Sequence, residues 1–128
     1  MEAKTLALVC RELADNKKAE EIVVLDVRKQ SNVTDYFVIC SGTSEPHLRA
    51  IVDEIEDQLL KDYGIKPHAA DGATGGGWVV MDFFDVIVHV MHPDVRKKYD
   101  LEGLWSDSPV VRPAARKRKP KAASAAAE

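Results

Sequence analysis

Residues Trp78–Trp105, WVVMDFFDVIVHVMHPDVRKKYDLEGLW, form the most informative stretch of this chain. Its first half contains two apolar runs, Trp78–Asp82 and Val86–His92, separated by the short segment Phe83–Asp85. This pattern predicts two strands paired as a hairpin. A short helix, Pro93–Tyr99, is expected to follow, with its proline in the first turn.

The end of the same stretch is rich in residue types that anchor protein interfaces. These residues are Arg96, Tyr99, Leu101, Glu102, Leu104 and Trp105. The stretch has no nucleophile beside a base, no phosphate loop and no metal-ligand cluster, so its composition favours binding over catalysis. A second interpretation stays open for Leu101, Leu104 and Trp105, because they can also close the open end of a core.

Helices and strands are also predicted upstream of this stretch. Apolar periodicity indicates a helix over Thr5–Leu13 and a longer helix between a capping Ser44 and a terminating Gly64. Strands are expected at Ile22–Val27 and at Asp35–Cys40, and the second is apolar on both faces, which is typical of a central strand. An edge strand and a glycine-rich turn complete the pattern, at Ile65–Ala70 and Asp71–Gly77. This order predicts an α/β fold with a mixed β-sheet flanked by helices.

The 128 residues suffice for a single domain, and their charge is unevenly distributed. Residues 1–111 hold 12 Lys and Arg against 20 Asp and Glu, a net charge of −8, whereas residues 112–128 have a net charge of +5. The acidic body suits a basic protein partner better than bare nucleic acid. We expect the folded domain to span residues 1–108 and the Ala/Lys/Arg/Pro-rich tail, 109–128, to be disordered.

The length of the apolar runs bears on the location of the protein, and the setting of its cysteines bears on their redox state. The longest uncharged apolar run, Val86–Met91, is too short to span a membrane, and no signal-peptide pattern is present at the N-terminus. Cys10 and Cys40 lie in apolar patterns typical of small buried side chains. We expect a cytoplasmic protein with reduced thiols and no membrane contact.

Four motifs, in this order, resemble those of the ribosomal silencing factor family (RsfS, also called Iojap). They are VVLDV at Val23–Val27, TDYFVICSGTS at Thr34–Ser44, HLRAIVDEIEDQLL at His47–Leu60, and the stretch Trp78–Trp105. The resemblance covers most of the chain. It implies a nucleotidyltransferase-like fold without the catalytic residues, and therefore neither enzyme activity nor a cofactor.

The resemblance also implies a function. Members of the family bind a basic protein of the large ribosomal subunit, ribosomal protein L-fourteen, and sterically block the joining of the small and large subunits. Translation is thereby repressed under nutrient limitation. For this chain the resemblance implies a ribosome-associated translation repressor that forms a homodimer when free.

Carried over position by position, the family pattern implies a partner-binding surface of eight residues. They are Trp78, Asp82, His89, Arg96, Tyr99, Glu102, Leu104 and Trp105. In this interpretation Trp78 and Trp105 are apolar anchors, while Asp82 and Glu102 pair with basic groups of the partner. One alternative stays open, because Arg96 can instead pair with Glu102 inside the protein.

Three residues depart from the usual family pattern: Phe84, Met91 and Lys98. The hairpin turn commonly has a glycine where this chain has Phe84, so a turn that requires a positive φ is expected to be strained here. Met91 and Lys98 stand where aromatic residues are common. These two changes are expected to alter affinity without altering the fold.

An enzyme of the nucleotidyltransferase type is the first alternative function. Two metal ions about 4 Å apart require carboxylates two positions apart on one strand. Asp82 and Asp85 are three positions apart, so they converge only if the segment between them forms a tight turn. No metal site is expected from the histidines either, because His89 and His92 have a spacing that directs them to different faces. We expect His89 to make a structural or interface hydrogen bond, with a satisfied core histidine as the competing interpretation.

A general RNA-associated protein is the second alternative. The sequence ARKRKP at Ala115–Pro120 is suited to a weak contact with rRNA phosphates without sequence preference, and a solubilising terminus is the competing interpretation. The glycine-rich sequence GATGGG at Gly72–Gly77 lacks the Lys-Ser/Thr pair of a phosphate-binding loop and precedes a strand rather than a helix. Nucleotide binding is therefore not expected there.

Overall fold

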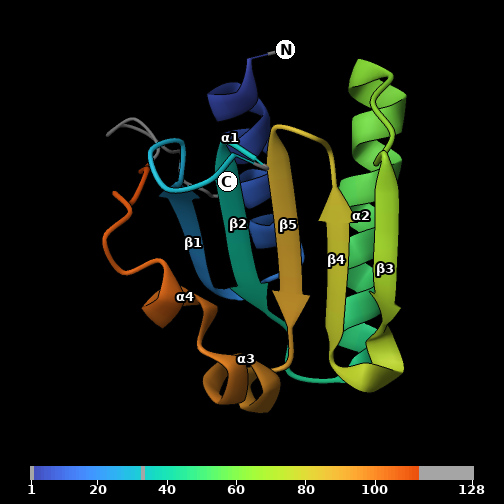
Figure 1. The fold of residues 1–128 in the computed structure, drawn as a ribbon. Helices are drawn as coiled ribbons and strands as arrows, with labels where there is room; N and C mark the ends of the chain where they lie inside the picture. The colour runs from blue at the N-terminus through green and yellow to red at the C-terminus, as the bar shows by residue number, and fades with distance from the viewer. Residues whose placement is uncertain (1, 33, 113–128) are drawn as a thin grey trace.

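A five-stranded mixed sheet organises the protein, whose computed structural model describes residues 2–32 and 34–112. The strand order is β1–β2–β5–β4–β3, and Figure 1 shows helices on both faces. Two helices, α1 (Ala3–Asn16) and α2 (Glu45–Tyr63), cover one face. Two short helices, α3 (Pro93–Tyr99) and α4 (Leu101–Leu104), pack on part of the other. The predicted α/β fold is confirmed.

Antiparallel pairs flank one parallel pair in the sheet. The strands are β1 (Glu20–Asp26), β2 (Tyr36–Ser41), β3 (Ala69–Ala73), β4 (Trp78–Asp82) and β5 (Val86–Met91). The second and fifth strands pair in parallel, and every other pair is antiparallel. The predicted hairpin is therefore present as β4 and β5. Every residue of β2 is buried, as predicted for an interior strand.

The long helix α2 has the expected caps. Ser44 Oγ accepts a hydrogen bond from the His47 backbone N–H at 3.2 Å, and Pro46 lies in the first turn. Gly64, with φ 67°, ends the helix in the left-handed conformation that glycine adopts without strain. The apolar stripe of the helix is fully buried and consists of Leu48, Ile51, Ile55 and Leu59.

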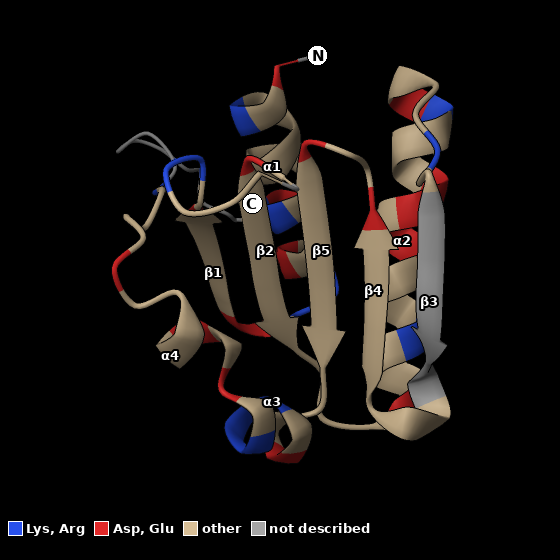
Figure 2. Cartoon of the chain, viewed as in Figure 1, with Lys and Arg blue, Asp and Glu red and all other residues tan. Residues whose placement is uncertain are grey.

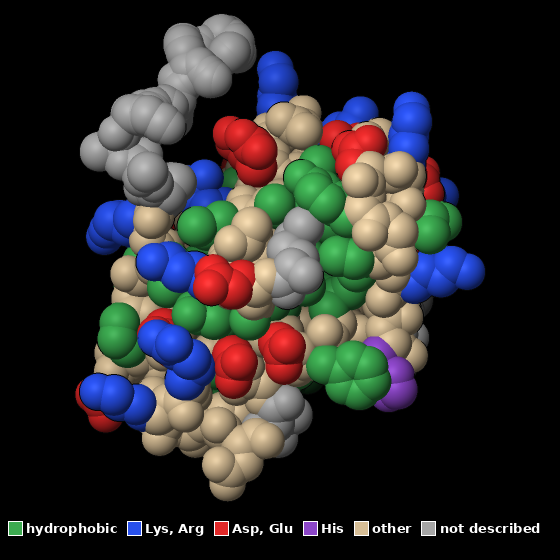
Figure 3. Space-filling model, turned by 90° about the horizontal axis from the view of Figure 1, so that it is seen from above, with side chains coloured by type: hydrophobic (Ala, Val, Ile, Leu, Met, Phe, Trp, Pro, Cys, Tyr) green, Lys and Arg blue, Asp and Glu red, His purple; other side chains and the backbone are tan. Residues whose placement is uncertain are grey.

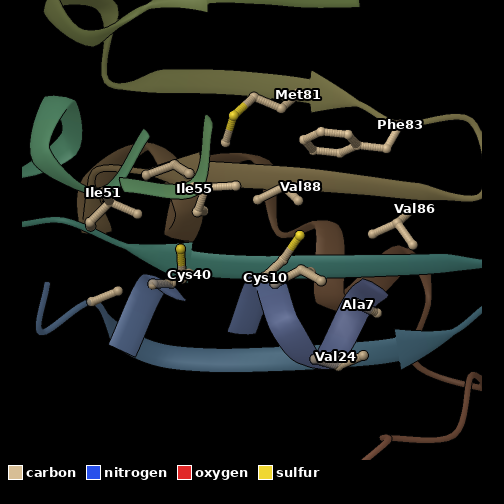
Figure 4. Packing of buried hydrophobic residues seen from close by; sticks show 14 of the residues in the cluster. Ala7, Cys10, Val24, Cys40, Ile51, Ile55, Met81, Phe83, Val86 and Val88 are labelled. Carbon is tan, nitrogen blue, oxygen red and sulfur yellow. The ribbon is translucent and has the colours of Figure 1, made fainter. Parts of the chain in front are cut away.

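The main hydrophobic core lies between the sheet and the two long helices (Figure 4). Side chains from α1 and α2 meet inward-facing residues of the strands, including Met81 and Val88. Cys10 and Cys40 are part of this core, and both are free thiols. Burial raises the pKa of each thiol to about 12, so both are protonated at neutral pH.

The predicted edge strand is present but displaced along the chain. It was expected at residues 65–70, whereas β3 spans Ala69–Ala73, and a 3-10 turn at Thr74–Gly76 follows. Pro67 has no N–H to donate, and pairing with β4 starts just after it, where the His68 N–H donates to the Asp82 carbonyl at 2.7 Å. The first residues of the expected glycine-rich turn therefore belong to a strand.

The C-terminal chain continues along the outer edge of β1. The Asp26 N–H donates to the Pro109 carbonyl at 2.9 Å, and the Val111 N–H donates to the Val24 carbonyl at 2.8 Å. The paired part of the chain thus reaches past the domain boundary expected at residue 108. Residues 113–128, which include most of the predicted tail and its basic sequence, lie outside the described residues.

Candidate functional site

The sheet face opposite the long helices is covered only in part. The short helices α3 and α4 lie at the end of the sheet where β2 and β5 finish (Figure 1). Along β4, burial alternates so that Val79 and Met81 are buried toward α2, whereas Trp78, Val80 and Asp82 are only half-buried on the opposite side. The half of this face that carries β4 is therefore an open surface.

Five aromatic rings contact one another in sequence across this face, and we call them the aromatic row. They are Tyr99, Trp78, His89, Phe37 and Trp105, and the four successive centroid distances are 5.0, 6.0, 5.3 and 5.1 Å. These separations lie in the range in which aromatic pairs attract one another. The rings come from α3, β4, β5, β2 and the end of α4, so the row ties the short helices to the sheet.

A hydrogen bond fixes the centre of the row. The Trp78 indole Nε1–H donates to His89 Nδ1 at 3.1 Å. Because an indole nitrogen only donates, Nδ1 must be unprotonated, and the neutral imidazole carries its proton on Nε2. His89 is 8% exposed, and burial lowers its pKa from 6.5 to about 4. The histidine is therefore a neutral, internally bonded residue at physiological pH.

Arg96 holds α3 and α4 in place from inside the protein. Its side chain is 7% exposed, and its Nε and Nη2 atoms donate to the two Glu102 carboxylate oxygens at 2.8 and 3.0 Å. Its Nη1 atom donates to Ser41 Oγ at 2.9 Å, at the end of β2. The internal pairing of Arg96 with Glu102 is thus the interpretation that the structure supports. This arrangement directs the guanidinium away from solvent, so Arg96 positions the short helices.

The junction between these helices is equally constrained. Asp100 has left-handed backbone angles, φ 47° and ψ 55°, and ends α3. The same residue caps α4, since its Oδ1 accepts from the Gly103 N–H at 3.1 Å. At the start of α3, His92 Nδ1 accepts from the Asp94 N–H at 3.2 Å. Both helices are therefore held at defined ends, although each is short.

The eight candidate residues differ in what they offer to a partner. Tyr99 and Leu104 are 51% and 75% exposed, and among the eight they contribute the most exposed apolar surface. Trp78, Asp82, Glu102 and Trp105 are half-buried, whereas His89 and Arg96 are buried. Sequence reasoning missed Phe37 as the ring that joins His89 to Trp105. In the sequence, the one feature that pointed to Phe37 was that its predicted strand is apolar on both faces.

The Asp82 carboxylate at the hairpin makes a backbone contact. Asp82 Oδ1 accepts from the Phe84 N–H at 2.7 Å, so the two residues belong to a turn. Among residues 2–32 and 34–112, no three His, Cys, Asp or Glu side chains gather in a way that suits a metal ion. None of the helices in these ranges combines the length and apolarity needed to cross a membrane.

Comparison with known proteins identifies the family. The model of the family described as "Ribosomal silencing factor during starvation" matches residues 1–128. The chain belongs to the ribosomal silencing factor family. The resemblance of its four motifs to RsfS is thereby confirmed.

Ribosomal silencing factors of several bacteria are similar to this chain over most of their length. The Bacillus subtilis RsfS protein is 41% identical over 111 residues, which cover 87% of this chain and 93% of that protein. The mouse protein named "Mitochondrial assembly of ribosomal large subunit protein 1" is 35% identical over 73% of this chain and 42% of its own length. A solved structure of a Chromobacterium violaceum protein superposes with a TM-score of 0.78 at 30% identity, over 89% of this chain and 92% of that one.

Proposed function

We propose that this protein silences translation by binding the large ribosomal subunit, through ribosomal protein L-fourteen, and sterically preventing the small subunit from joining. The observation that carries the proposal is the open sheet face with its aromatic row, in a chain of the ribosomal silencing factor family. The name of the mouse relative also associates that protein with the large ribosomal subunit.

The proposed contact surface combines apolar anchors with peripheral acids. Tyr99 and Leu104 supply exposed apolar area, and the Trp78 ring packs against the Tyr99 ring. Aromatic and aliphatic anchors of this kind dominate the free energy of many interfaces. Asp82 is a half-buried carboxylate at the end of β4 and is suited to a basic group of the partner, whereas both oxygens of the half-buried Glu102 carboxylate already accept from Arg96. His89 and Arg96 contribute by holding the anchors.

Charge distribution supports a basic protein partner. Residues 1–111 have a net charge of −8. Figure 2 shows charged residues on helices, loops and strand ends, and within β4 and β5 the single acidic residue is Asp82, at the end of β4. An apolar centre with charges at its margin is the usual anatomy of a specific protein interface. The surrounding negative charge would accelerate encounter with a basic protein.

Inhibition by occupancy requires no chemical step. In this mechanism each bound molecule removes one large subunit from joining, so the effect depends on the concentration of the protein and on its dissociation constant. No catalytic group is needed, and we propose that the protein is not an enzyme. It would act in the cytoplasm.

Two further properties belong to the proposal. The free protein forms a homodimer, either through the same apolar face or through an exposed sheet edge, because such surfaces tend to associate when no partner covers them. The basic residues beyond Val111, with a net charge of +5, add a weak and salt-dependent contact to rRNA.

Co-sedimentation tests the proposed function. Purified protein is mixed with large ribosomal subunits, small subunits are added, and the mixture is separated on a sucrose gradient. The protein is expected to travel with the large subunit and to lower the fraction of joined ribosomes. Protein that stays at the top of the gradient at both low and moderate salt would contradict the proposal. A chain ending at Arg112 should still bind, whereas an RNA-associated protein acting through its tail would lose binding.

A further inference from the structure

The turn between β4 and β5 carries an aromatic side chain in an unusual backbone conformation. Phe84 has φ 70° and is 62% exposed. Bulky L-residues rarely adopt positive φ, because Cβ then approaches the following carbonyl oxygen, whereas glycine adopts it freely. Strain of this kind is often found at binding sites, so its presence calls for a function of the Phe84 ring.

The turn is held by backbone hydrogen bonds that do not involve this ring. The Phe84 N–H donates to Asp82 Oδ1 at 2.7 Å, and the Phe83 N–H donates to the Val86 carbonyl at 2.8 Å. The Asp85 carbonyl accepts from two backbone N–H groups at the start of β2, both at 3.0 Å. A glycine at position 84 would make the same turn with less strain. The side chain is therefore presented on a rigid support but is not required by it.

One face of the ring is already occupied. The His68 imidazole lies against Phe84, with 4.0 Å between centroids and an interplanar angle of 32°. Because Phe84 is still 62% exposed, much of the ring remains open to solvent. The two side chains come from different strand ends and form a small aromatic platform at the edge of the open face.

Carboxylates adjoin this platform. Asp82 precedes Phe84 by two residues and uses one oxygen for the turn, and Asp85 follows it directly and is exposed. Figure 3 looks onto this end of the molecule, where acidic side chains lie among hydrophobic ones. A planar cation, stacked on a ring and paired with a carboxylate, matches this combination of groups. A nucleic-acid base also stacks on rings, but its phosphates would be repelled by these carboxylates.

We propose that Phe84, with His68 beneath it and Asp82 and Asp85 beside it, is a docking point for an arginine side chain of the protein partner. The proposal rests on the proposed function for the existence of that partner. Asp82 lies on the same face of β4 as Trp78 and four residues away, which corresponds to about 13 Å along a strand. One partner can therefore contact the aromatic row and the platform together.

Binding of large ribosomal subunits to three variants tests the contact. Phe84→Gly removes the ring and relieves the backbone, while Phe84→Leu keeps apolar bulk without a π-face. Both are expected to lower the affinity roughly tenfold, and Phe84→Tyr is expected to retain it. Thermal stability of the glycine variant should equal or exceed that of the original protein, which separates a lost contact from a damaged fold.

The outcomes separate this inference from the proposed function. If the original protein binds the subunits and the glycine and leucine variants bind within twofold of it, the docking point is wrong and the proposed function stands. If the original protein does not bind, the proposed function fails and the inference fails with it.

Photo-crosslinking identifies what lies on the ring. p-Benzoylphenylalanine at position 84 is incorporated, the protein is bound to large subunits and irradiated, and the products are analysed by mass spectrometry. A crosslink to a ribosomal-protein peptide that contains an arginine supports the proposal. A crosslink to rRNA, or to a second copy of this chain, would overturn it.

Discussion

Tyr99 and Tyr63 expose nearly equal fractions of their surface, 51% and 49%, on opposite sides of the sheet. Tyr99 ends α3 and is the first ring of the aromatic row, whereas Tyr63 ends α2 on the side of the main core. Each side chain is about half exposed, so its removal leaves no fully enclosed cavity. Comparing alanine variants at these two positions therefore shows whether a loss of binding comes from one face of the sheet or from the removal of any exposed tyrosine.

Replacing Tyr99 with alanine is expected to weaken binding to the large ribosomal subunit by about 2 kcal/mol, because the proposed contact surface loses an exposed aromatic anchor. Tyr63→Ala should change the binding free energy by less than about 0.5 kcal/mol. Affinities measured on purified subunits would show the difference. Equal losses from the two variants would place the partner elsewhere.

Stability should depend on pH through His89. Its pKa is about 4 in the folded protein and 6.5 ordinarily, so between these values the unfolded chain binds a proton that the folded protein does not. The free energy of unfolding is then expected to fall as the pH drops from 6.5 to 4, by up to about 3 kcal/mol. Urea denaturation at intervals of pH measures this dependence.

His89→Gln is the control for this dependence. The glutamine cannot be protonated in this range, and its carbonyl oxygen can accept the Trp78 N–H. Other titrations are shared by both proteins and cancel in the comparison. They include Asp26, whose pKa is held below its usual value by hydrogen bonds from Arg28, and Glu56, whose pKa is raised by burial. Parallel pH curves for the two proteins would exclude His89 as the source.

Arg96→Lys is expected to destabilise the protein by about 2 kcal/mol, because an ammonium group cannot replace the two parallel bonds to Glu102 and also reach Ser41. The variant should also bind the large subunit less well, since α3 carries Tyr99. Arg28→Lys is the matched control: its guanidinium also donates to both oxygens of a carboxylate, that of Asp26, but its side chain is 58% exposed, so the change should cost much less stability. Chemical denaturation of both variants checks the contrast, which would disappear if Arg96 were only a surface residue.

The two cysteines should be unreactive in the folded protein. Both thiols are buried, and burial raises the pKa of each to about 12, so almost no thiolate is present at pH 8. A chromogenic disulfide reagent is expected to label neither Cys10 nor Cys40 until urea unfolds the chain, and then to label both. Rapid labelling without denaturant would indicate that the core between α1 and β2 opens easily.

Local pattern was sufficient to predict most of the secondary structure. The hairpin, the interior strand and the capped helix α2 were predicted because apolar periodicity, a serine cap and a left-handed glycine act over a few residues. The resemblance indicated that a positive φ would be strained at Phe84 and that the hairpin would differ for this reason, whereas the structure has a positive φ, 70°, at this residue. The edge strand β3 lies further along the chain than predicted. Its position is determined by pairing with β4, which the glycine-rich sequence does not reveal.

The site was harder to predict, because its contacts join residues that are distant in sequence. Trp78 and His89 are 11 positions apart, and Arg96 and Ser41 are 55 apart. A pattern along the chain identifies the residue types at these positions, but it does not show which of them bond to each other. Trp78 was interpreted as an outward anchor, yet its N–H is used inside the protein. The internal role of Arg96 was one of two open alternatives, and only the packing of α3 against β2 distinguishes them.

The parallel pairing of β2 with β5 has a consequence for the order in which the protein acquires its shape during synthesis. The two strands are separated by the whole of α2 and the hairpin strand β4, so the centre of the sheet cannot close until residue 91 has been made. The aromatic row is completed later still, because it contains both Phe37, in the first third of the chain, and Trp105. A chain that ends before Trp105 therefore lacks the last ring of the row, and the full row can form only once residue 105 has been made.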